Sequence, residues 1–285
     1  MQLDVSVCKG KIRNAANPSE RHKLIAALIV KDILCVLFAV VFISILNFLF
    51  GDENSSAAVV IFCILLTVRF VDFGYCLKSS LINFFIVFVL LTFSPCIAQS
   101  VNPAWGFLIN FLSIGFIVIS ACHEPLYGGA GLYLFAYMFL YGNPVGGHLL
   151  VLRVFEMLLG CLLCGIIFYI RKKDYGKTFS QIVKDFSLFD PLGKWQFQVT
   201  LGLSLGILVG ELLQVDRIMW VGCACLTVLS QYGERPNKRA FQRLGGVVAG
   251  SVLFGIVYQL LPASAHSYLG IYSGLLLGLC AAYHW

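Results

Sequence analysis

The stretch RVFEMLLGCLLCGI, residues 153–166, decides how this chain can fold, because it combines an arginine and two glycines within an apolar run. A second stretch, RLGGVVAGSVLFGI at residues 243–256, repeats the spacing R-x6-G-x4-G-I. Seven residues at about 100° each return to within about 20° of the starting direction, so the arginine and the first glycine share one helical face. We therefore expect two helices that pack closely through this face, because glycine lets another backbone approach.

The composition of the chain indicates a membrane protein. Of its 285 residues, 59% are hydrophobic and 12% are charged, which leaves too little polar surface for a water-soluble globule. Residues 1–23 are polar and basic and lead directly into a long apolar run, so we expect no cleaved signal peptide. The 11 cysteines lie almost wholly in apolar segments, where we expect packing and neither a metal site nor redox chemistry.

The apolar runs predict an all-α polytopic membrane protein with about ten transmembrane helices. A spanning helix needs about 20 apolar residues. The candidates lie near residues 33–50, 57–71, 80–97, 104–121, 128–141, 149–170, 196–215, 218–231, 240–262 and 267–283. The fifth and eighth have clean runs of only about 14 residues, so they must be tilted, extended into loops, or broken and sheltered by neighbours.

These spans divide the chain into four parts. They are a cytoplasmic N-terminal segment with an interfacial run-in, a first six-helix half, a cytoplasmic linker and a second, incomplete half: residues 1–32, 33–170, 171–195 and 196–285. With the N-terminus in the cytoplasm, every strongly basic loop falls on the cytoplasmic side, as the positive-inside rule requires. The net charge of +6 then reflects attraction to anionic lipid of the bilayer and does not call for a nucleic-acid partner.

The repeated motif predicts inverted three-helix repeats. Arg153 opens the sixth span at its outer end, whereas Arg243 opens the ninth at its inner end, so the motif occurs upside down. Glycines spaced by four residues also recur in the first helix of two units, at Gly202, Gly206 and Gly210 and at Gly270, Gly274 and Gly278. We expect two further spans to complete this pattern, supplied by residues beyond 285 or by a homo-oligomer, with a dimer favoured.

From about residue 196 to 260 an apolar helix is followed by a tryptophan, a Leu-Thr pair, a basic turn and an Arg-Gly helix. The residues are Trp220, Leu226, Thr227, Arg235, Arg239, Arg243, Gly246 and Gly250. This order resembles the FUSC superfamily, the fusaric acid resistance proteins and aromatic acid exporters of bacterial inner membranes. The resemblance implies an exporter of organic anions in the cytoplasmic membrane. Members typically have two six-helix halves, and this chain departs from that pattern in its second half.

Basic residues are the first candidates for a solute pathway. Arg235, Arg239 and Arg243 form a basic turn that would gather organic anions at the inner side, together with Trp220 of the same motif. Arg153 would lie at the opposite mouth. The alternative is that these arginines extend to lipid phosphates while the glycines pack.

The richest polar stretch runs from residue 123 to 148 and interrupts apolar sequence with two prolines and six glycines, as a broken helix around a binding site would. Within it, Tyr133, Tyr137 and Tyr141 recur every fourth residue and therefore form one hydroxyl-bearing aromatic stripe. Such a stripe can stack on an aromatic solute. Alternatively, it belongs to the aromatic belt at the membrane interface.

Glu156 and Glu211 are the carboxylates embedded in apolar helices, and both are candidates for proton coupling, although Glu211 lies near a helix end and can simply be hydrated. No hydrolase, zinc-protease or phosphate-loop motif occurs, so we expect no enzyme, no cofactor and no catalytic residue. The sequence favours a proton-driven exporter of aromatic or other amphipathic organic anions. An anion channel of the same superfamily and a non-transporting membrane subunit are the alternatives.

Overall fold

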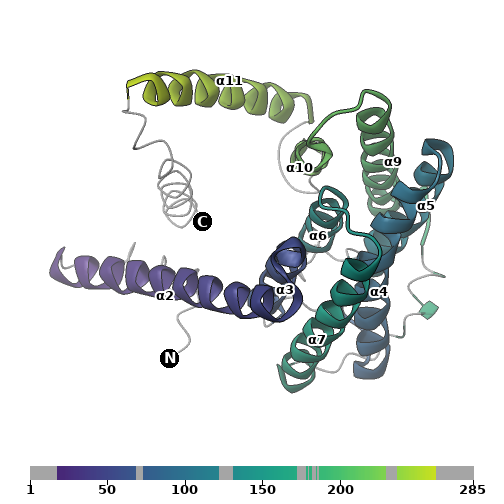
Figure 1. The fold of residues 1–285 in the computed structure, drawn as a ribbon, viewed down its shortest axis with the longest axis horizontal. Coiled ribbons are helices and arrows are strands. Elements are labelled where there is room, and N and C mark those ends of the chain that lie inside the picture. Colours follow the sequence, from purple (N-terminus) through teal and green to yellow (C-terminus); the bar gives the residue numbers. More distant parts are fainter. Residues whose placement is uncertain are drawn as a thin grey trace. The chain divides into compact units, whose positions relative to one another are not determined.

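The structure is a computed structural model, and it describes residues 18–68, 73–121, 131–171, 178, 180–181, 184, 186–228 and 236–260. Within these ranges the regular structure is helical and contains no strand, which confirms the all-α prediction for this part of the chain (Figure 1). The elements are α2 (Pro18–Phe50), η1 (Asp52–Asn54), α3 (Ser55–Thr67), α4 (Leu77–Ser100), α5 (Pro103–Ala121), α6 (Leu132–Tyr141), α7 (His148–Arg171), α9 (Pro191–Leu212), α10 (Ile218–Val228) and α11 (Pro236–Leu260).

Four of the described helices are long and apolar enough to cross a membrane. The qualifying segments are Ile33–Phe50, Leu77–Ser100, Pro103–Ala121 and His148–Ile170. α6 is equally apolar but has only 10 residues. The expected tenth span, near 267–283, lies outside the described residues, so the count of ten helices and the inverted repeat stay predictions.

The chain forms two compact units. One comprises Met1–Val41 and Phe241–Trp285, and the other comprises Phe42–Ala240. In the first unit the described helical segments carry exposed apolar side chains such as Leu37 and Val247. The second unit contains α3 to α10.

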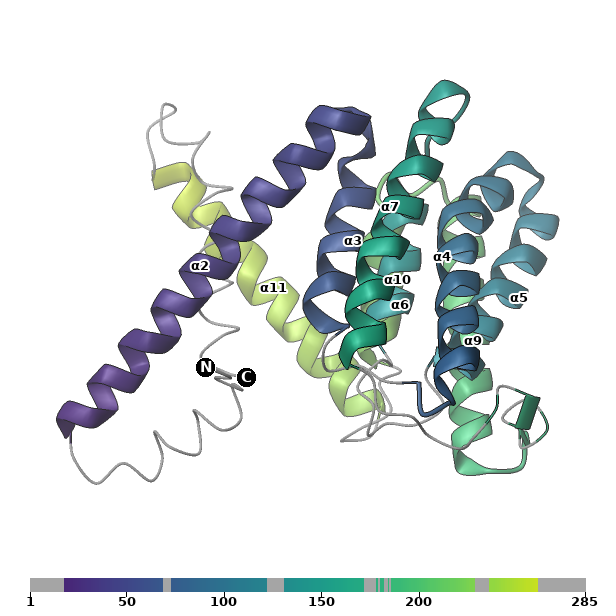
Figure 2. The same cartoon turned by 90° about the horizontal axis from the view of Figure 1, so that it is seen from below.

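α6 lies at the centre of the second unit. It contacts α3, α4, α5 and α10, while α7 packs on α3 and α4, and α9 packs on α5 and α10. Figure 2 shows α3, α7, α4 and α5 side by side in this unit. Seven of the ten α6 residues are buried, as expected for a helix that is apolar on all sides. A helix of this length was expected to be tilted, extended into loops, or sheltered by neighbouring helices. The burial of α6 agrees with shelter by its neighbours.

Glycine determines how closely α7 approaches α3. A Cβ added at Gly160 would lie 2.5 Å from Cγ1 of Ile61, so the Ile61 side chain packs directly onto the α7 backbone where glycine lacks a side chain. This agrees with the packing face expected of residues 153–166. In contrast, a Cβ at Gly246 or Gly250 would meet nothing within 4 Å in the structure.

The turn between α2 and α3 also depends on a glycine. Gly51 has φ 91°, a conformation that residues with a Cβ rarely adopt. Its N–H donates to the carbonyl oxygen of Asn47 at 2.8 Å, which closes the end of α2. The chain then forms η1, and this short helix carries Asn54 into the interior, where it is fully buried.

Candidate functional site

Arg153 is the centre of a buried polar cluster near the start of α7. Its side chain is 1% exposed and donates three hydrogen bonds. Nε donates to Oδ1 of Asn54 at 3.1 Å, Nη2 to Oγ of Ser56 at 2.9 Å, and Nη1 to the carbonyl oxygen of Asn143 at 2.8 Å. We call these four residues the arginine clamp. The clamp joins η1, the start of α3 and the loop after α6 to α7.

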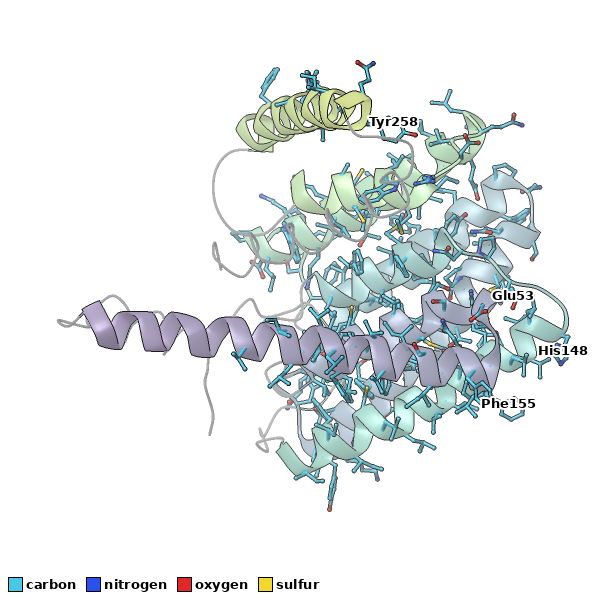
Figure 3. All side chains as sticks on the ribbon, turned by 60° about the vertical axis from the view of Figure 1, so that its left-hand side comes forward. Glu53, His148, Phe155 and Tyr258 are labelled. Atoms are coloured by element: carbon cyan, nitrogen blue, oxygen red, sulfur yellow. The ribbon has the colours of Figure 1, made fainter. Side chains whose placement is uncertain are left out.

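The clamp is reinforced at both of its asparagines. Asn54 Nδ2 donates to the carbonyl oxygens of Phe50 and Leu149, each at 3.2 Å. Asn143 Nδ2 donates to the carbonyl oxygen of Phe139 at 2.8 Å, so it stays attached to the last turn of α6. Figure 3 shows Glu53 and His148, the neighbours of this cluster on η1 and α7, at the same end of the bundle.

Glu156 lies one helical turn beyond Arg153 and is fully buried. Neither of its carboxyl oxygens has a hydrogen-bond partner in the described part of the chain. Burying a carboxylate without a partner costs several kcal/mol, even in a relaxed protein interior. The form of Glu156 that fits this structure is therefore the neutral carboxylic acid.

A second polar group runs through the α6 tyrosines. Tyr137 Oη donates to Oδ1 of Asn110 at 2.7 Å, and Asn110 Nδ2 lies 3.4 Å from Oη of Tyr141. Tyr141 Oη in turn donates to Oε1 of Glu211 at the end of α9. We call these four residues the tyrosine chain. The hydrogen bonds run in one direction, from the Tyr137 hydroxyl through the Asn110 amide and the Tyr141 hydroxyl to Glu211.

The aromatic rings of α6 pack inside the protein. The Tyr137 and Tyr141 rings are stacked with centroids 6.4 Å apart, and both are buried. The Tyr133 ring stacks on Phe73 at 5.9 Å and so belongs to a separate aromatic cluster. In the described bundle the predicted stripe is thus split, with two tyrosines in the polar chain and one in apolar packing.

The remaining predicted pathway residues lie largely outside the part of the chain whose side chains the structure describes. Trp220 lies on α10 and is 56% exposed. Arg239 and Arg243 fall within the bounds of α11, but their side chains lie outside the described part, as does the whole of Arg235. The basic turn therefore stays a prediction.

Sequence reasoning missed the neutral partners of both clusters. Asn110 is a lone amide in the apolar α5, and a polar side chain in such a helix usually faces another helix, so it was a detectable signal. Asn54, Ser56 and Asn143 carried no comparable signal, because they stand among other polar residues at helix ends.

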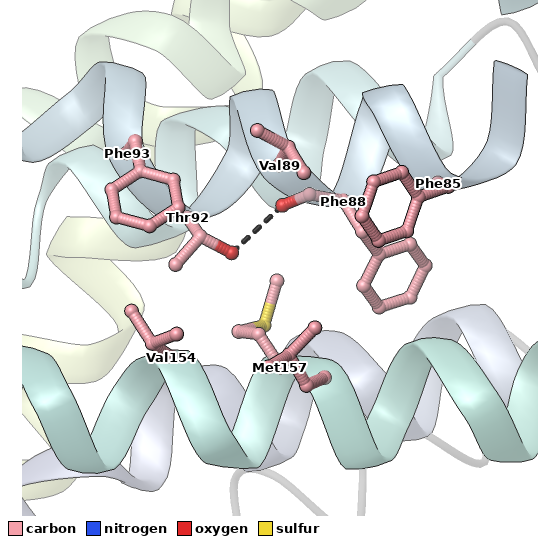
Figure 4. Close-up of a pocket in the computed structure, with 8 residues that line it drawn as sticks. Phe85, Phe88, Val89, Thr92, Phe93, Val154 and Met157 are labelled. Carbon is pink, nitrogen blue, oxygen red and sulfur yellow. Dashed lines mark hydrogen bonds between the residues drawn. The ribbon is translucent and has the colours of Figure 1, made fainter. Parts of the chain in front are cut away.

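A crevice opens between α4 and α7 beside these clusters. It has a volume of about 30 Å³, and Figure 4 shows its lining, which consists of Phe85, Phe88, Val89, Thr92, Phe93, Val154, Met157 and Leu158. Thr92 is the polar residue of this lining, and its hydroxyl donates to the carbonyl oxygen of Phe88 at 2.7 Å. The other lining residues are apolar. Sites for organic ligands measure roughly 300–1,000 Å³. An aromatic acid therefore does not fit this crevice in the conformation seen.

These features define a helical membrane protein with two buried polar clusters in its larger unit. Residues 203–285 match the model of the fusaric acid resistance protein-like family. This match supports membership of the FUSC superfamily and confirms the resemblance carried by Trp220 and the Arg-Gly helix. No curated protein and no solved structure matches the chain. At the level of the family, the match suggests membrane transport or efflux.

Proposed function

We propose that this chain is a transporter that exports aromatic or other amphipathic organic anions in exchange for protons. The tyrosine chain carries the proposal, because it combines aromatic rings, hydroxyl donors and a carboxylate within a helix bundle. The family match over residues 203–285 supports it. We assign the protein to a bacterial inner membrane with a cytoplasmic N-terminus, and we expect it to act as a homodimer.

The tyrosine chain has the chemistry that an aromatic carboxylate requires. The rings of Tyr137 and Tyr141 offer faces on which an aromatic solute stacks. The Tyr141 hydroxyl and the Asn110 amide donate hydrogen bonds, and Glu211 now accepts the one from Tyr141. A solute carboxylate would take the position of Glu211 as acceptor when α6 is exposed to a pathway.

The basic residues and the second carboxyl group complete the proposed cycle. Arg235, Arg239 and Arg243, with Trp220 nearby in sequence, would concentrate anions at the cytoplasmic entrance. Glu156 and Glu211 would each bind a proton from the outer side and release it to the cytoplasm. Ionisable groups inside membrane helices are costly, and they commonly mark such proton relays.

Reconstitution of the full chain into liposomes tests this proposal. A gradient of phthalate, an aromatic dicarboxylate, is imposed while an enclosed dye reports pH and a second probe reports membrane potential. A carrier produces a phthalate-dependent pH change that protein-free liposomes lack. Phthalate conductance without a pH change would establish a channel instead, and neither signal would establish a non-transporting subunit.

A matched variant makes the test specific. Glu53→Gln removes an exposed carboxyl group on η1 and should leave the pH change intact. Glu211→Gln removes the acceptor at the end of the tyrosine chain and should reduce it. Equal reduction in both variants would show that the signal follows surface charge and not the proposed site.

A further inference from the structure

Arg153 and Glu156 are a basic and an acidic residue that are buried on the same helix, yet they do not form a hydrogen bond with each other. The guanidinium donates its three hydrogen bonds to neutral acceptors, on Asn54, Ser56 and Asn143. The Glu156 carboxyl group, three residues along the same helix, has no hydrogen-bond partner within the described residues. Side chains at positions i and i+3 of a helix are about 5–6 Å apart at Cβ, so the two groups are within reach of each other.

The protonation of Glu156 therefore decides which partner the guanidinium prefers. A neutral carboxylic acid offers little attraction, and the guanidinium stays with the clamp. An ionised carboxylate forms charge-assisted hydrogen bonds that are roughly twice as strong as those to neutral acceptors. Leaving that carboxylate unpaired inside the bundle is costly, so ionisation pulls the guanidinium toward Glu156 and away from the clamp.

Few other ionisable groups compete for this pair. Elements that pack on α7 contribute Cys63 on α3, Cys96 and Lys78 on α4, and Asp52 and Glu53 on η1, while α7 itself adds His148, Cys161, Cys164, Tyr169 and, at its last position, Arg171. Cys96 lies against Arg153, and Asp52 and Glu53 are exposed. Arg153, one turn away on the same helix, is therefore the nearest cation that the described part of the chain offers Glu156.

We propose that Arg153 and Glu156 form a proton-controlled latch at the end of the bundle where η1, the loop after α6 and the start of α7 meet. With Glu156 protonated, the arginine clamp is closed. When Glu156 releases its proton to water, its carboxylate binds the guanidinium and the clamp opens. No other covalent bond changes.

The latch reaches the tyrosine chain through α6. Asn143, which the clamp holds, follows Tyr141 by two residues and is bonded back to Phe139. Opening the clamp frees this end of α6 and with it the segment that carries the Tyr141 hydroxyl. The latch itself requires no solute, whereas its use as a gate for solute rests on the proposed function.

Distance measurements on the full chain test the latch without any solute. Spin labels are attached to cysteines at Asp52 on η1 and at Gly146 in the loop after α6, in a background cleared of native cysteines. Both positions are exposed, and a side chain at Gly146 meets nothing within 4 Å. On titration from about pH 5 to about pH 9, where carboxyl groups lose their protons, the parent should pass from one short distance to a mixture with a longer distance.

Variants decide which group is responsible. Glu156→Gln and Glu156→Met both carry neutral side chains and should lack the longer distance at every pH. Glu156→Met keeps the test valid if Glu156→Gln fails to insert into the membrane. Glu53→Gln, which removes an exposed carboxyl group, should respond as the parent does. A parent distance that does not change with pH, or the same change in Glu156→Gln and Glu156→Met, would overturn the latch. Phthalate-dependent proton movement is measured separately, so either idea can fail while the other stands.

Discussion

The hydroxyl group of Tyr141 on α6 donates a hydrogen bond to Glu211 on α9, although the two residues are 70 positions apart in the sequence. Tyr141 also lies beside the Asn110 amide, so three helices share one line of hydrogen bonds. In a bundle embedded in lipid, such contacts specify which helices meet, because apolar side chains pack equally well against lipid and protein.

Removing this hydroxyl should destabilise the bundle. Tyr141→Phe leaves Glu211 without its donor and Asn110 without one neighbour, and we expect a loss of about 1 kcal/mol in the free energy of unfolding. Tyr169→Phe, on the 60% exposed Tyr169 of α7, is the matched control. The free energy of unfolding of both variants is measured in mixed detergent micelles. Equal stability of the two variants would contradict the role given to the tyrosine chain.

Close packing of α7 on α3 should depend on one glycine and not on its neighbour in the same motif. Gly160→Leu places a side chain where even a Cβ would lie 2.5 Å from Ile61, so α3 and α7 must separate, at a cost of about 3 kcal/mol. Gly165→Leu meets nothing within 4 Å and should melt like the parent. Thermal melting in detergent compares the two, and a similar loss in both would show that general helix propensity explains the effect.

The two motif arginines should differ in what they control. Arg153→Lys cannot reproduce three divergent hydrogen bonds, so stability should fall by about 2 kcal/mol. Arg243→Lys should leave stability nearly unchanged but raise the solute concentration needed for half-maximal transport, if Arg243 binds carboxylate in a bidentate way. Melting and phthalate transport are measured on both, with Arg217→Lys on an exposed arginine as control. The opposite assignment, with Arg243 stabilising and Arg153 affecting solute affinity, would refute this division.

The predicted topology places residues 171–195 in the cytoplasm. A cysteine at Tyr175, in a background cleared of native cysteines, should react with an impermeant reagent only after the cells are permeabilised, because basic loops stay on the inner side. A cysteine at Asn143, between the fifth and sixth predicted spans, should react in intact cells. Labelling of position 175 in intact cells would reverse the orientation.

Helix positions were predictable because apolar runs bounded by polar residues set them. α4 and α7 begin and end within about three residues of the predicted spans. The shared face of Arg153 and Gly160 followed from helical periodicity, and the contact of Gly160 with α3 agrees with it. These features are local, so a single segment of sequence contains them.

The partners of each buried polar group were not predictable in the same way. Ser56 is 97 residues from Arg153, and nothing in either segment encodes their contact. The tyrosine stripe left two alternatives open, because α6 is apolar all round and its hydropathy does not distinguish a face toward lipid from one toward other helices. The basic residues at 235–243 stay predictions, since their side chains lie outside the described residues.

The central claim is that protons drive solute export through buried carboxyl groups of this bundle. Its most direct test compares the parent with Glu156→Gln in liposomes, at equal protein content, in two assays. The first measures phthalate accumulation driven by a pH gradient, and the second measures exchange of labelled for unlabelled phthalate without a gradient. We predict that Glu156→Gln loses the gradient-driven accumulation at least tenfold, roughly a 1.4 kcal/mol change in coupling, while exchange persists. Full gradient-driven accumulation by Glu156→Gln would contradict the account.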